Sequence, residues 1–63
     1  MEDFKKRVLQ EGEELKTKME ALGKFILTEK FDELHKDEQA DLKEQLLIMV
    51  KYLNILTRRI TRW

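Results

Sequence analysis

Apolar side chains recur at 4-3-4-3 spacing through the last third of the chain. The positions are Leu42, Leu46, Met49, Leu53, Leu56, Ile60 and Trp63. Three heptads without Gly or Pro predict one long helix with a seam of the coiled-coil type. A second stripe, Ile48, Tyr52 and Ile55, lies roughly 110° around the same helix, at about 100° per residue. Because a helix that is apolar on two sides needs cover on both, we expect more than one neighbour for it.

The first half of the chain carries a matching heptad seam, which predicts a helix over residues 3–27. Its positions are Val8, Gly12, Leu15, Met19, Leu22 and Ile26. Asp3 is the predicted N-cap, a position at which Asp is favoured. Gly12 has two interpretations: close approach of a neighbouring helix, or a tolerated weak point that costs about 1 kcal/mol relative to Ala.

The segment between the two seams predicts a turn. Thr28 is the expected N-cap of a short helix over residues 29–35, and His35 is expected as a solvent-exposed turn residue. Asp37 is the predicted N-cap of a second long helix, over residues 38–61. The two long helices are similar in length, which favours an antiparallel pair. The expected fold class is therefore all-α: a long helical hairpin with a short connecting helix.

The size of the chain bears on how the core is completed. We expect residues 1–63 to form a single helical domain, and a core of this size is marginal by itself. There is no Cys and only one His, so neither a disulfide nor a zinc site is expected. Self-association remains, and we expect a homo-oligomeric helical bundle. The absence of Cys also fits a cytoplasmic location, and no apolar run approaches the ~20 residues that span a bilayer.

The formal net charge is zero, but the charges are segregated. Residues 10–49 hold 11 acidic and 6 basic side chains, whereas residues 50–63 hold four basic and no acidic side chains. An antiparallel hairpin brings the residues from Phe4 to Arg7 to the same basic end. The acidic body repels a long nucleic acid lying along it, and the first helix has no cationic face opposite an apolar one for membrane binding.

The basic end supplies the candidate ligand-binding residues. Continuing the second stripe leads to two arginines, with two further cations beside them and two aromatic rings nearby. The candidates are Lys51, Tyr52, Arg58, Arg59, Arg62 and Trp63. Arginines grip phosphates, and aromatic rings stack on bases, so this mixture suits a small anionic nucleotide.

A structural interpretation of the same residues stays open. Cations near a helix C-terminus are favoured by the macrodipole and can neutralise acidic neighbours in an oligomer. Tyr52 also suits an interface, and Trp63 suits an end plug of the bundle. No nucleophile motif accompanies His35, so we expect no catalytic residue, metal or cofactor.

Several short motifs extend over nearly the whole chain: Phe4-x-x-Arg7-Val8, Glu14-Leu15, Leu22-x-x-Phe25-Ile26, Phe31-x-x-Leu34, Leu42-x-x-Gln45 and Met49-x-x-Tyr52-x-x-Ile55-Leu56-x-x-Arg59-Ile60. With these motifs the chain resembles a family of very short proteins of tailed phages and prophages. In size and hairpin architecture it is also similar to phage sponges that sequester the nucleotide signals of the CBASS and Thoeris defence systems. No binding residue carries over from those sponges.

That resemblance implies a function. The expected protein binds a cyclic oligonucleotide or a signal of the cyclic ADP-ribose type and sequesters it without cleavage. The alternative is a small helical protein that inhibits a host or phage protein by direct binding. The expected partners are further copies of the chain, a small anionic nucleotide and, for the alternative, a host defence protein.

Overall fold

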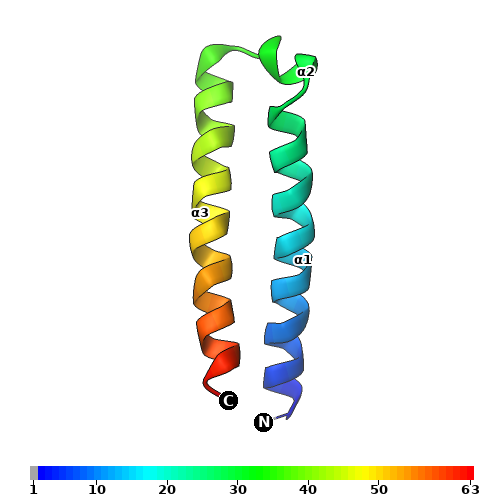
Figure 1. Ribbon diagram of the computed structural model, residues 1–63, viewed down its shortest axis with the longest axis vertical. Helices are drawn as coiled ribbons and strands as arrows, with labels where there is room; N and C mark the ends of the chain where they lie inside the picture. Colours follow the sequence, from blue (N-terminus) through cyan, green and yellow to red (C-terminus); the bar gives the residue numbers. More distant parts are fainter. Residues whose placement is uncertain (1) are drawn as a thin grey trace.

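The computed structural model describes residues 2–63 and shows two long helices side by side in antiparallel orientation (Figure 1). Helix α1 spans Glu2–Ile26, the short helix α2 spans Glu29–Asp32, and α3 spans Lys36–Thr61. The rod measures 46 × 14 × 13 Å, with α2 at one end and both chain termini at the other. The all-α hairpin with a short connecting helix is therefore confirmed.

The structure corrects both predicted caps of the long helices. Helix α1 already includes Glu2, so Asp3 lies in its first turn and is not the N-cap. His35 is the N-cap of α3, since its Nδ1 accepts a hydrogen bond from the backbone N–H of Asp37 at 3.2 Å. Asp37 therefore lies inside the first turn. A carboxylate in a first turn still favours the positive helix terminus, which explains why Asp suits both positions.

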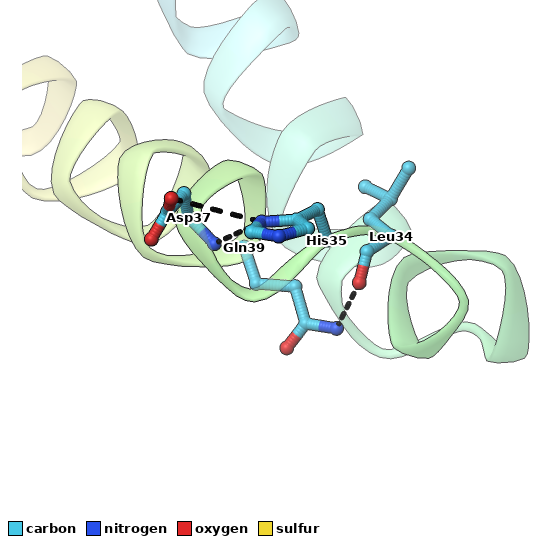
Figure 2. Close-up of polar contacts among 4 residues, drawn as sticks. All are labelled: Leu34, His35, Asp37 and Gln39. Atoms are coloured by element: carbon cyan, nitrogen blue, oxygen red, sulfur yellow. Dashed lines mark hydrogen bonds and ion pairs between the residues drawn. The ribbon is translucent and has the colours of Figure 1, made fainter.

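The predicted cap of the short helix is confirmed. Thr28 Oγ1 accepts a hydrogen bond from the N–H of Phe31 and donates one to the carbonyl of Phe25. Helix α2 ends at Asp32, three residues earlier than predicted, because the chain turns toward α3 there. The Gln39 side chain holds this turn by donating to the carbonyl of Leu34 at 2.9 Å (Figure 2) and to that of Asp32 at 3.2 Å.

A buried aromatic ring anchors the turn end. Phe31 is buried and meets the ring of Phe25 edge-on, with ring centroids 6.1 Å apart. The Nζ of Lys43, from α3, lies 5.7 Å from the Phe31 ring centroid. Phe31 thus contacts residues of both long helices and fixes where they are joined.

The two predicted seams meet along the hairpin. The centre of the core is formed by Val8, Leu15 and Leu56, and the Leu56 side chain is 0% exposed. Partly buried seam residues of α3 pack against this centre: Met49, Leu53 and Ile60. Trp63 departs from the pattern, because α3 ends at Thr61 and the indole stays half-exposed.

The second stripe of α3 is uncovered in the single chain. Ile48 is 58% exposed, Tyr52 41% and Ile55 43%. Gly12 lies on the seam, yet a Cβ added there meets nothing within 4 Å. The close approach proposed for Gly12 therefore does not occur between α1 and α3. No helix within residues 2–63 carries an apolar stretch long enough to cross a membrane.

Candidate functional site at the open end of the hairpin

The open end of the hairpin gathers cations from both long helices. The start of α1 contributes Lys5, Lys6 and Arg7, and the end of α3 contributes Arg58, Arg59 and Arg62. All are exposed except Arg59, which is half-buried. The last turn of a helix favours positive charge because its carbonyl groups are unpaired there. This effect favours the arginines at the end of α3 but not the cations in the first turns of α1, which the antiparallel arrangement brings to the same end.

Two aromatic rings lie among these cations. The Phe4 and Trp63 ring centroids are 6.0 Å apart, with a 58° angle between the ring planes. Arg59 Cζ lies 5.5 Å from the Phe4 centroid, and Lys5 Nζ lies 5.6 Å from the Trp63 centroid. Cations at this distance are attracted to the negative face of a ring, by about 0.5–1 kcal/mol at exposed sites. These four residues, Phe4, Lys5, Arg59 and Trp63, are called the open-end cluster below.

The cluster has a clear chemical character. Both rings keep a large exposed fraction, and an exposed ring can stack on a planar base. The neighbouring guanidinium can donate paired hydrogen bonds to a phosphate or carboxylate. A group that is both planar and anionic matches this combination.

The structure brings together only part of the predicted site. Arg59 and Trp63 belong to the open-end cluster, and Arg58 and Arg62 lie beside them on α3. Tyr52 is seven residues from Arg59, which is about 10 Å along a helix at 1.5 Å per residue. Tyr52 and its neighbour Lys51 therefore lie apart from the open-end cluster, on the exposed stripe of the same chain.

Phe4 and Lys5 were not among the predicted site residues. The predicted antiparallel hairpin already placed the start of the first helix beside the end of the second, and this proximity is the feature that points to them. Their contacts with Arg59 and Trp63 depend on the register between α1 and α3, and helical spacing alone does not give that register.

Two surface hollows lie elsewhere on the rod. The larger, about 690 Å³, is open and is lined by residues of α1 alone, where Glu13 and Glu14 outweigh Lys18 and make the lining negative, which does not suit an anion. The smaller, about 190 Å³, is a groove between α1 and α3 beside Gly12, lined mainly by apolar residues such as Leu9, Leu53 and Ile60. Neither hollow is lined by any of the six predicted ligand-binding residues.

Charge pairing within the chain is sparse. Among the side chains of residues 3–63, no Lys or Arg lies within 4 Å of a carboxylate, and the one close approach of this kind is between His35 Nδ1 and the Asp37 carboxylate, 3.7 Å apart and exposed at the turn end (Figure 2). The arginines of the open end thus have no carboxylate partner among the side chains of residues 3–63. The same residues contain no group of three His, Asp or Glu side chains placed to hold a metal ion.

Comparison with known families identifies the family of the chain. The family model described as Sequestin matches residues 2–62, so the chain belongs to the Sequestin family. No curated protein and no solved structure matches it.

Proposed function

We propose that this member of the Sequestin family binds a small anionic nucleotide and sequesters it without altering it. The family name describes sequestration and specifies no ligand. We infer a nucleotide ligand from the chemistry of the open end. Its role as an immune signal is inferred from the resemblance to phage sponges. On this proposal the protein is a phage anti-defence sponge for a cyclic oligonucleotide or a signal of the cyclic ADP-ribose type.

The observation that carries the proposal is the open-end cluster. Phe4 and Trp63 offer two half-exposed rings, and Arg59 and Lys5 lie over those rings. The proposed phosphate-binding residues are Lys51, Arg58, Arg59 and Arg62. Trp63 and Tyr52 are the proposed base-stacking residues, since a stacked base contributes about 1–3 kcal/mol.

Self-association is part of the proposal. The single chain shows the cluster as an open surface, whereas ligand pockets bury most of a small molecule. The rod also leaves Ile48, Tyr52 and Ile55 uncovered. A second copy that covers this stripe supplies the missing wall, and it brings the stripe and the open end into one assembly.

Sequestration requires no chemistry on the ligand. His35, the one imidazole of the chain, caps α3 at the turn end, opposite the open-end cluster. The proposal therefore assigns no catalytic residue, and it predicts that bound ligand is released intact after the protein is denatured.

Calorimetry with a panel of cyclic dinucleotides and cyclic ADP-ribose isomers tests the proposal. We expect one panel member to bind, and to stabilise the fold by about 2.7 kcal/mol when its concentration is 100 times Kd. Arg59→Ala and Trp63→Leu should weaken binding, whereas Lys30→Ala, at the turn end, serves as the matched control. If no nucleotide in the panel gives measurable binding, the proposal is wrong. Chemically altered ligand after denaturation would indicate an enzyme instead.

The exposed stripe of α3 supports a second candidate, a helical protein that inhibits a host or phage protein by direct binding. An apolar helix face of this kind can dock into a groove of a partner. This candidate predicts capture of one specific protein that Tyr52→Glu abolishes, together with no response to nucleotides.

A further inference from the structure

The second stripe of α3 is the centre of a longer seam. Extended in both directions at the same 4-3 spacing, this seam begins at an acidic residue, continues through apolar residues and ends at two arginines. Glu44 lies next to Gln45, the second residue of the seam. The seam consists of Asp41, Gln45, Ile48, Tyr52, Ile55, Arg59 and Arg62. All seven are exposed in the single chain except Arg59, which is half-buried. A heptad seam along a helix is the pattern by which one helix pairs with another.

This seam is complementary to itself when it is reversed. An antiparallel copy places Asp41 opposite Arg62, and Glu44 opposite Arg59. The same alignment places Ile48 opposite Ile55. All three pairings share one midpoint, between Lys51 and Tyr52, so the two Tyr52 side chains meet near the two-fold axis. A single alignment thus matches opposite charges at both ends and apolar side chains in the middle.

We propose that two copies of this chain pair in antiparallel orientation through this seam of α3, so that two hairpins form a four-helix bundle. The proposal rests on the self-association in the proposed function but not on the nucleotide. It assigns the occupant of the exposed face and the orientation of the copies, as an isologous two-fold contact requires.

Charge decides between the two orientations. A parallel pair places Arg59 and Arg62 against the same residues of the other copy, and Asp41 against Asp41. Like charges that face each other across a helix pair are unfavourable. The antiparallel pair replaces these contacts with opposite charges, and none of these groups has an ion-pair partner among the side chains of residues 3–63.

The size of the contact sets the strength of the association. A side of the rod measures 46 × 14 Å, about 640 Å² in projection. Stable interfaces bury about 800 Å² per partner, and weak ones less than about 600 Å². The dimer therefore lies toward the small end of this range, and we expect it to assemble at micromolar concentrations.

The pairing also refines the candidate ligand site. Arg59 and Arg62 meet carboxylates across the interface, while Lys51 and Arg58 flank the seam and remain at its rim. The open-end cluster of each copy then lies beside the turn end of the other. Arg58 can contact a bound phosphate there without separating the copies, whereas Lys51 lies about 10 Å away along α3, near the two-fold axis.

Sedimentation equilibrium of charge-exchanged variants without nucleotide tests the orientation. Asp41→Arg or Arg62→Glu alone places like charges at both ends of the antiparallel dimer, and each should raise the dimer Kd about tenfold. The double variant restores opposite charges and should return to within about threefold of the parent. Glu20→Arg makes the same charge change on the exposed outer side of α1 and is the matched control. If the single and double variants all match the parent, the seam does not pair this way.

Cross-linking provides an independent measurement, because the chain has no cysteine of its own. Ile48→Cys mixed with Ile55→Cys should form a disulfide between copies under mild oxidation. Ile48→Cys alone should not, since antiparallel pairing offsets the two Ile48 positions by about 10 Å along the axis, beyond disulfide reach. Leu47→Cys, also exposed, is the control, and circular dichroism verifies that each variant is helical. Self-cross-linking of Ile48→Cys would overturn the proposal.

The outcomes of these experiments distinguish failure of the dimer from failure of the proposed nucleotide binding. A chain that stays monomeric at hundreds of micromolar would overturn the dimer and the self-association in the proposed function. A dimer with the expected variant pattern that binds no nucleotide supports the inference and contradicts the sponge.

Discussion

Phe4 and Trp63 lie at opposite ends of the sequence, yet their ring centroids are only 6.0 Å apart. This contact ties the first turn of α1 to the residues that follow α3, where helix ends otherwise fray. Because Arg59 and Lys5 lie over the same two rings, one cluster both closes the open end and supplies the candidate ligand chemistry. The stability of this end and the binding of a ligand are therefore linked.

Loss of the aromatic pair should be measurable in stability. We expect Phe4→Ala and Trp63→Ala each to destabilise the hairpin, with a coupling energy of about 0.5–1.5 kcal/mol between them, as for aromatic pairs in general. A double-mutant cycle from urea denaturation, followed by circular dichroism, measures this coupling. A coupling of zero would mean that the rings do not interact in solution.

Leu56 is the most sensitive core position. Its side chain is 0% exposed, and Leu→Ala changes in a core cost about 2–5 kcal/mol. A domain has about 0.05–0.15 kcal/mol of stability per residue, so Leu56→Ala should remove a large part of the free energy of unfolding of this short chain. Leu47→Ala, at a position 55% exposed, is the matched control and should change stability by less than about 0.5 kcal/mol. Equal effects at both positions would contradict the core described here.

Gly12 offers a stabilising substitution. Because an added Cβ meets nothing within 4 Å, Gly12→Ala should raise the free energy of unfolding by about 0.5–1 kcal/mol. Gly23 is equally unhindered and should respond in the same way to Ala. Thermal denaturation of the two variants at equal concentration checks this. If Gly12→Ala alone weakens self-association, the groove beside it accommodates a second copy, contrary to the pairing through α3.

Two threonines should respond differently to substitution by Ala. Thr28→Ala removes the N-cap of α2 and should cost about 0.5–2 kcal/mol. Thr17 lies exposed in the middle of α1 with its hydroxyl bonded to the carbonyl of Glu13, so Thr17→Ala should be neutral or slightly stabilising. Chemical denaturation of both variants tests the difference. A neutral Thr28→Ala would show that the buried ring of Phe31, not the cap, fixes the turn.

Much of the fold follows from periodicity. The heptad positions of α1 and α3 identify the side chains that meet in the core, such as Val8 and Leu56, because spacing alone fixes which face of a helix is apolar. The N-caps of the two long helices were predicted less well from the sequence. His35 caps α3 because its ring reaches the N–H of Asp37, a local geometry that general preferences for Asp at caps do not reveal.

The candidate site was only partly predictable, for a different reason. Spacing along α3 places Arg59 and Arg62 on one face but does not say which residues of α1 lie at the same level. Phe4 and Lys5 join the site through the register of the hairpin, which depends on how the turn is built around Phe31. Residues contributed by a second copy are still harder to predict from one sequence, because they depend on how the copies pack.

The distribution of burial along the rod implies an order of events during folding. The buried core cluster of Val8, Leu15 and Leu56 lies toward the open end and joins segments that are distant in the chain. Closing so long a loop costs entropy before any of these contacts is gained. The turn around Phe31 needs only local contacts, so it can form early and align the two helices. Zipping then proceeds from the turn, and the aromatic contact between the chain ends is the last to form.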